Sequence, residues 1–377
     1  MKAIVNGRIL LRNEILENKV LIFDEKIIDI ADAVPSGCET IDAKGKLVSP
    51  GFIDIHIHGN MGKDTMEGTD EAIDTISKSI ARHGVTSYLP TTMTMDEESI
   101  AKALDSVRRG MNRNIDGAKV LGAHLEGPFI NKIYKGAQNG DYIVNPSYDF
   151  VKKYEDVIKV ITYSPEEDID FKFTKDIKNN TDIVLSIGHS AATFTEARDA
   201  IRLGANNITH TFNGMTGLNH RDPGVVGAAL TTDVYCEFIC DTIHITKDLF
   251  QFILDSKGKD NVVLITDSME AGGLEDGTYS LGGQAVIVKD GAARLESGSL
   301  AGSVSSLNRM VKNFYENTSL KINEVVHLAS LNPARSLGID NKKGSLDIGK
   351  DADIAIFDNE LNCHMTISNG EVIFNQI

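Results

Sequence analysis

The stretch Ser49–Gly59 constrains the fold most strongly, because an apolar run in it alternates with two histidines at the spacing of a β-strand. Side chains two residues apart on a strand lie on the same face, so His56 and His58 are expected to point together. Two imidazoles from one strand provide half of a divalent metal site. Ten histidines among 377 residues produce roughly 0.3 such pairs by chance, so a metal site needs further ligands elsewhere in the chain.

Composition and charge exclude several classes of function. The formal net charge is −16, and Lys and Arg form no run or stripe, which argues against nucleic acid or an anionic membrane as a partner. The four cysteines are scattered, and no apolar run is long enough to span a membrane. The first residues lack the apolar core of a signal peptide. We therefore expect a cytoplasmic protein with reduced thiols.

Short apolar segments broken by turns occur at both ends of the chain. Asn6-Gly7 and Asp24-Glu25 separate those near the N-terminus, and Asn369-Gly370 predicts a hairpin turn near the C-terminus. Neither end has enough strands to bury a core alone. We expect residues 1–50 and 345–377 to form one small β-sandwich domain, beside a catalytic domain of residues 51–344.

The middle of the chain alternates strand-like runs with helical periods. Helices are expected over Asp70–His83, Asp96–Arg109, Thr193–Leu203 and Lys247–Lys257. The expected strands are Phe52–His58, Val85–Thr92, Lys119–Glu126, Val157–Tyr163, Ile183–His189, Asn207–His210, Tyr235–Asp241 and Val262–Asp267. Eight such repeats predict an α/β fold with a (β/α)8 TIM barrel, whose active-site residues lie where the strands end.

Many of the predicted strands end in side chains that bind metals or titrate. Glu126, His189 and His210 lie at three of these ends, and a carboxylate with two imidazoles leaves a position open for water, as a catalytic divalent site requires. Each residue also has an ordinary alternative, either an exposed loop carboxylate or a hydrogen-bonded structural histidine. His124 precedes Glu126 by two residues and is either another site residue or a partner that orients a ligand.

Asp267 ends an almost wholly apolar strand. It could cap the following segment. Beside a water activated by a metal, it could instead accept the water's proton and deliver it to a leaving amine, and we favour this role. Backbone N–H groups in Thr211–Met215 could hold an anion, and Arg221 is the nearest strong cation, although most surface arginines are simply solvated.

Several blocks of the sequence together resemble the amidohydrolase superfamily and, within it, the deacetylases of amino-sugar phosphates. They follow the family's order from residue 50 toward the C-terminus, which is more specific than any single motif. The blocks are Pro50–Asp54, His124–Phe129, Gly188–Ser190, His210–Met215, Arg221–Gly227, Asp241–His244, Thr266–Asp267, Leu300–Ser303 and Asn332–Arg335.

The resemblance implies a role for each matching residue. It assigns the general acid/base to Asp267. The ligands of the catalytic divalent metal would be Glu126, His189 and His210, and those of a second metal would be His56 and His58. The metal would be Zn, Fe, Mn or Co, with one or two ions per subunit. The substrate would be held by Gln138, Asn213, Gly214, His244 and Ala301, and by Arg221, which would reach into the neighbouring subunit of a homodimer.

The activity implied by the resemblance is hydrolysis of the N-acetyl group of N-acetyl-D-glucosamine 6-phosphate, in amino-sugar catabolism and cell-wall sugar recycling. The chain departs from the usual pattern at Gln138, where many relatives have His, at Gly214, where Ala is usual, and at Thr242, where Gly is common. Two alternatives stay open. One is deacetylation of N-acetylgalactosamine 6-phosphate or of another amide, and the other is a non-catalytic barrel that acts as an interaction protein.

Overall fold

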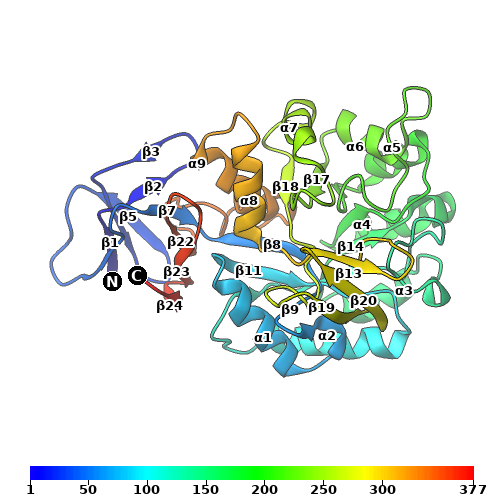
Figure 1. Ribbon diagram of the computed structural model, residues 1–377, viewed down its shortest axis with the longest axis horizontal. Coiled ribbons are helices and arrows are strands. Elements are labelled where there is room, and N and C mark those ends of the chain that lie inside the picture. The colour runs from blue at the N-terminus through cyan, green and yellow to red at the C-terminus, as the bar shows by residue number, and fades with distance from the viewer.

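Parallel strands form two sheets in the middle of the chain, whose residues 1–377 the computed structural model describes throughout (Figure 1). One sheet contains β8 (Phe52–Ile57), β11 (Val85–Pro90) and β12 (Lys119–Val120). The other contains β13 (Ala123–Glu126), β14 (Ile158–Tyr163), β15 (Val184–Ile187), β16 (Asn207–Ile208), β17 (Tyr235–Phe238) and β18 (Val262–Leu264). The strands predicted from the sequence are therefore present, mostly with shorter bounds.

The two parallel sheets contact each other along both edges. A parallel bridge joins Thr91 to His124, and another joins Ile57 to Ser268, just beyond β18. All six residues of β8 are buried, as expected for a parallel strand that is covered on both faces. This arrangement brings the C-terminal ends of the strands together.

Helices lie between successive parallel strands and after the last of them, β18. The longer ones are α1 (Asp70–Ala81), α2 (Glu97–Met111), α4 (Lys172–Asn180), α5 (Phe194–Leu203), α6 (Gly224–Thr231), α7 (Phe250–Lys257) and α8 (Leu307–Glu316). Short helices are α3 (Tyr148–Val151), α9 (Ile322–Val325) and α10 (Leu331–Ser336). The predicted capping box of α5 is confirmed, since the Thr193 hydroxyl accepts from the Glu196 N–H while Glu196 accepts from the Thr193 N–H.

Two glycines explain two of the differences between the observed and the predicted elements. The predicted strand Lys119–Glu126 is interrupted because Gly122 has φ 152°, a conformation that breaks the regular ladder. We expected α2 to end before Gly110, but the helix continues to Met111. A Cβ at Gly110 would lie 2.9 Å from Ile73 Cγ2, so this glycine allows α2 to pack closely on α1 rather than ending it.

Strands from both ends of the chain pair with each other. In one six-stranded sheet, β7 (Leu47–Pro50) pairs with β22 (Ile354–Phe357), beside β2 (Arg8–Leu10), β3 (Ile15–Leu16), β23 (Cys363–Ser368) and β24 (Glu371–Asn375). The second sheet contains β1 (Lys2–Val5), β4 (Val20–Phe23), β5 (Ile27–Ala31) and β6 (Glu39–Asp42). The predicted hairpin turn is confirmed, with positive φ at both Asn369 and Gly370 between β23 and β24.

A small antiparallel sheet after β18 was not predicted. It contains β19 (Gly277–Leu281), β20 (Gln284–Lys289) and β21 (Ala292–Leu295). Its buried side chains form a separate apolar cluster with Met93, Ala137, Met269 and Ala301. Residues of β20 alternate between buried and exposed. A side-chain pattern that repeats every two residues is typical of a half-buried strand, and it is the signal in the sequence from which this strand could have been predicted.

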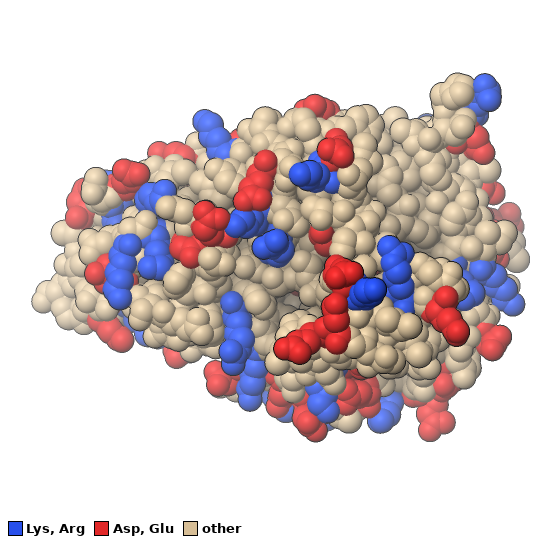
Figure 2. Space-filling model, in the orientation of Figure 1, with Lys and Arg blue, Asp and Glu red and all other residues tan.

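The outer surface is mixed in charge. On the face drawn in Figure 2, Lys and Arg side chains are interspersed with Asp and Glu and form no continuous basic stripe. None of the helices combines the length and apolar character needed to cross a bilayer.

Candidate active site

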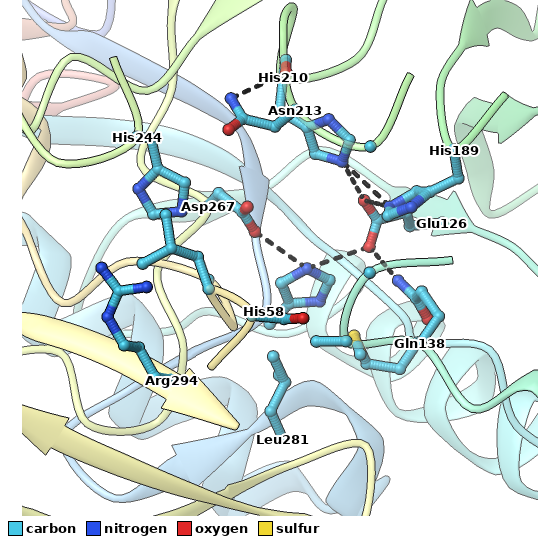
Figure 3. Close-up of a pocket in the computed structure, with 17 residues that line it drawn as sticks. His58, Glu126, Gln138, His189, His210, Asn213, His244, Asp267, Leu281 and Arg294 are labelled. Carbon is cyan, nitrogen blue, oxygen red and sulfur yellow. Dashed lines mark hydrogen bonds and ion pairs between the residues drawn. The ribbon is translucent and has the colours of Figure 1, made fainter. Parts of the chain in front are cut away.

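A cavity of about 400 Å³ opens at the C-terminal ends of the parallel strands (Figure 3). Most of the residues singled out from the sequence line it. These are His58, Glu126, Gln138, His189, His210, Asn213, Gly214, His244 and Asp267. The predicted convergence of these side chains on one site is therefore observed, although they come from segments spread over more than half of the chain.

Glu126, His189 and His210 meet at the floor of this cavity. Glu126 Oε1 lies 3.1 Å from Nε2 of His189 and 3.1 Å from Nε2 of His210, and the two Nε2 atoms lie 3.1 Å apart. The Nδ1–H of His189 donates to the Tyr134 carbonyl at 2.9 Å, which fixes the ring so that Nε2 is directed toward Glu126. These ligand atoms are therefore close enough together to bind one cation.

His56 and His58 approach the same carboxylate from the other side. Their Nε2 atoms each lie 3.3 Å from a Glu126 oxygen, and they lie 3.4 and 3.2 Å from Asp267 Oδ1. A second group of ligand atoms therefore contains His56, His58 and Glu126. Glu126 is common to both groups.

The buried carboxylates require positive charge beside them. Burial alone would raise the pKa of Glu126, but the positive charges of His56 and His189 hold it well below its usual range. Burial alone would lower the pKa of His58, but hydrogen bonds to Asp267 and Glu126 raise it to about 9. In the absence of another cation, protons on the imidazoles supply this charge, and a divalent ion would displace them. The donor set therefore fits a divalent metal.

Asp267 lines the cavity beside His56 and His58. Burial alone would raise the pKa of its carboxyl, but the charge of His56 and the hydrogen bond from His58 lower it to about 2, so it is ionised near neutral pH. The backbone at Asp267 is fixed, because its N–H donates to the His56 carbonyl at 2.9 Å and its carbonyl accepts from the Ser303 N–H at 2.7 Å.

The backbone at these strand ends is strained. His189, His210 and Asp267 have φ values of 49°, 28° and 47°, in the region that residues with a side chain seldom adopt. Each such residue costs about 1–3 kcal/mol, which the surrounding packing must offset. This backbone conformation directs each of the three side chains from the end of its strand into the cavity.

Two further buried residues lie beside the histidines of the site. Glu237, in β17, was not predicted as a site residue; its Oε2 accepts from His56 Nδ1 at 3.1 Å and from the His210 N–H at 3.3 Å. His124 contacts the Ile55 carbonyl and the Thr162 hydroxyl through its two ring nitrogens. Burial and the nearby charge of His56 hold the pKa of His124 well below its usual value, so it is neutral. The His124 ring packs edge-on against that of His56, with centroids 4.6 Å apart, and its two alternative roles, site residue or orienting partner, stay predictions.

The predicted substrate contacts lie in different surroundings. Gln138 donates through Nε2 to Glu126 Oε2 at 2.5 Å and accepts from the Thr94 N–H at 2.7 Å, so its amide is directed toward the Glu126 carboxylate. Ala301 is fully buried, and its neighbours Leu300 and Gly302 line the cavity instead. Arg221 does not line the cavity of its own chain; its guanidinium lies on an exposed loop and donates to His220 at 3.0 Å.

Comparison with known proteins places this geometry in a family. Residues 47–373 match the Amidohydrolase family. The chain belongs to the amidohydrolase family. This amidohydrolase is 39% identical over 355 residues to the N-acetylglucosamine-6-phosphate deacetylase of Lysinibacillus sphaericus, covering 93% of this chain and 91% of that protein. It is 35% identical over 359 residues to the N-acetylgalactosamine-6-phosphate deacetylase of Escherichia coli O157:H7, and this match covers 93% of this chain and 95% of that protein.

Solved structures agree with the sequence comparison. The crystal structure of N-acetylglucosamine-6-phosphate deacetylase from Pasteurella multocida superposes with a TM-score of 0.93 at 30% identity, and covers 98% of this chain and 99% of its own. This similarity extends over the middle of the amidohydrolase and over both of its chain ends.

Further cavity-lining residues of this amidohydrolase were missed in the sequence. Leu281 and Arg294 come from the small sheet of β19–β21, and Met93 follows the end of β11. No motif marks any of them, and only the folding of the small sheet over the strand ends brings Leu281 and Arg294 to the site.

Proposed function

We propose that this amidohydrolase hydrolyses the N-acetyl group of N-acetyl-D-glucosamine 6-phosphate, giving D-glucosamine 6-phosphate and acetate in amino-sugar catabolism and cell-wall sugar recycling. The observation that carries this proposal is the position of Asp267 beside the Glu126, His189 and His210 cluster in a single cavity. The similarity to N-acetylglucosamine-6-phosphate deacetylases over more than nine-tenths of the chain supports the choice of substrate.

The architecture proposed for this function is a (β/α)8 TIM barrel of residues 51–344 with a β-sandwich domain of residues 1–50 and 345–377. Parallel bridges at both edges of the two parallel sheets support closure of the barrel. The pairing of β7 with β22 and a separate apolar cluster, which includes Ile4, Phe23 and Ile356, support one domain built from both ends.

In the proposed mechanism Glu126, His189 and His210 hold the catalytic divalent metal, which is Zn, Fe, Mn or Co. When bound, the ion supplies Lewis acidity toward the amide carbonyl and an attacking water. Asp267 accepts the proton of that water as oxygen adds to the acetyl carbon. Asp267 then returns the proton to the sugar nitrogen as the C–N bond breaks, so that acetate and the free amine leave.

The sugar phosphate is proposed to bind on the other side of the cavity. His244 Nδ1 donates to Asp241 Oδ2 at 2.7 Å, which leaves Nε2 free for the ligand. Asn213 and Gly214 line the cavity beside it. Binding far from the scissile bond orients the amide toward Asp267, so that binding energy is used to lower the barrier of the reaction.

We also propose a homodimer in which Arg221 reaches the phosphate bound by the neighbouring subunit. The exposed position of Arg221, outside its own cavity and without a carboxylate partner, supports this role.

A second metal is proposed at His56 and His58, which would hold it together with Glu126. The His56→Asn, His58→Asn double variant should lower the bound metal by about one ion per chain, since it removes two of three ligand side chains. Metal content after gel filtration measures this, and His220→Asn, an exposed histidine, is the matched control. Equal metal content in the double variant and the wild type would refute the second site.

The galacto epimer is the second candidate substrate, because one relative is an N-acetylgalactosamine-6-phosphate deacetylase. Acetate release from both epimers, measured as kcat/KM on one preparation, tests the choice. We expect the gluco epimer to be preferred at least about tenfold, a difference worth about 1.4 kcal/mol in transition-state binding. A preference for the galacto epimer would replace the proposed substrate, and no acetate from either would leave the alternative of a non-catalytic interaction protein.

A further inference from the structure

Arg294 is the only lysine or arginine among the residues that line the active-site cavity. Its Nη1 donates to the Gly298 carbonyl at 2.9 Å, and no carboxylate lies within ion-pair distance of its guanidinium. The chain has a net charge of −16, so this unpaired guanidinium is the one lysine or arginine with which the chain's own cavity can attract an anionic substrate.

The strand that carries Arg294 is tied to the segment that carries Asp267. Arg294 forms an antiparallel bridge with Leu300, and the Ala301 N–H donates to the Ala293 carbonyl at 3.0 Å. Two residues later the Ser303 N–H donates to the Asp267 carbonyl at 2.7 Å. These hydrogen bonds hold the backbone of Arg294 at a fixed place relative to the proposed acid/base.

The apolar cluster under the small sheet adds to this anchoring. Val286, Val288 and Ala293 of the sheet are buried against Met93 and Ala301. The sheet therefore covers the cavity as a packed element, and it presents Arg294 at the cavity's rim.

The position of Arg294 suits the far end of the substrate. In the view of Figure 3, Arg294 and His244 are drawn on one side of the cavity, and His189 and Glu126 are on the other. The scissile amide must lie near Glu126 and Asp267, so a phosphate at the opposite end of the sugar would lie toward Arg294 and His244. A guanidinium binds phosphate through two parallel N–H groups, and Gly298 engages only one of its nitrogens.

We propose that Arg294 binds the 6-phosphate of the substrate from within the same chain. This inference rests on the proposed function and deepens it. It adds a phosphate ligand that does not depend on a neighbouring subunit, in contrast to the role proposed for Arg221. Arg294 is thus a binding residue that selects phosphorylated over unphosphorylated amino sugars.

The test compares Arg294→Ala and Arg294→Lys with the wild type on N-acetylglucosamine 6-phosphate and on unphosphorylated N-acetylglucosamine. For Arg294→Ala we expect kcat/KM on the phosphorylated sugar to fall about 50-fold, mainly through KM, because a charge-assisted hydrogen-bonded contact is lost. Arg294→Lys should recover part of this loss, and the rate on the unphosphorylated sugar should not change. Inorganic phosphate should also inhibit Arg294→Ala more weakly than it inhibits the wild type.

Two controls separate the possible failures. Arg309→Ala removes an exposed arginine of α8 that does not line the cavity, and it should leave all parameters unchanged. If the wild type releases no acetate from either sugar, the proposed function fails. If the wild type is active, then unchanged KM and unchanged phosphate inhibition in Arg294→Ala overturn the inference, as does an equal loss on both sugars. An Arg221→Ala variant that alone loses phosphate selectivity would assign the phosphate to the neighbouring subunit instead.

Discussion

The Asp267→Asn protein is expected to keep its metal and to lose about three orders of magnitude in kcat, the contribution of a well-placed general acid/base. An amide cannot accept the proton of the attacking water, and it cannot deliver one to the departing nitrogen. The metal should stay, because the closely grouped atoms of Glu126, His189 and His210 do not include Asp267. The measurements are kcat from acetate release and metal content, made on the same sample.

A matched control for this variant is Asp248→Asn, because Asp248 is exposed and lies outside the cavity. Its kcat should equal that of the wild type. A kcat within tenfold of the wild type in Asp267→Asn would contradict the role of acid/base. Loss of the metal in the same variant would show that Asp267 acts as a ligand instead.

The Glu126→Gln protein is expected to lose both its metal and its activity. Four imidazole Nε2 atoms, those of His56, His58, His189 and His210, lie 3.1 to 3.3 Å from the Glu126 carboxylate. Removing its charge takes away the one carboxylate that is common to both proposed metal sites. Metal affinity should fall at least about 100-fold, which exceeds the usual effect of changing a residue that only orients a ligand.

Metal content after dialysis against a defined concentration of free metal measures this effect, and Glu275→Gln, an exposed carboxylate, is the control. A variant with wild-type metal content but no activity would show that Glu126 acts on the substrate and not as a ligand.

The sequence predicts a site residue correctly where the pattern within a single strand is enough to place its side chain. Apolar and polar residues alternate in Phe52–His58, which predicts that the His56 and His58 side chains lie on the same face of the strand. Both Nε2 atoms do lie 3.3 Å from a Glu126 oxygen. The predicted strand ends at Glu126, His189, His210 and Asp267 also meet in one cavity. Such predictions succeed because a parallel α/β fold fixes where strand ends lie once the strands are recognised.

The sequence was uninformative where a role depends on contacts between distant segments. Glu237 is a buried carboxylate in the apolar strand β17, and only its contact with His56, 181 residues away, shows what it does. Arg294 lies in a hairpin sheet whose place over the cavity depends on packing against Met93 and Ala301. Gln138 lines the cavity, where a contact with the sugar stays a prediction, and its hydrogen bond to Glu126 could not be anticipated from the loop that contains it.

The most direct test of the central claim is acetate release from N-acetylglucosamine 6-phosphate by chelated protein to which a divalent metal is added back. Metal content per chain is measured in the same samples. The metal-free protein should be inactive, and activity should rise with bound metal to a plateau at about two ions per chain. Full acetate release by protein shown to be free of metal would contradict the account, as would metal-loaded protein that releases no acetate.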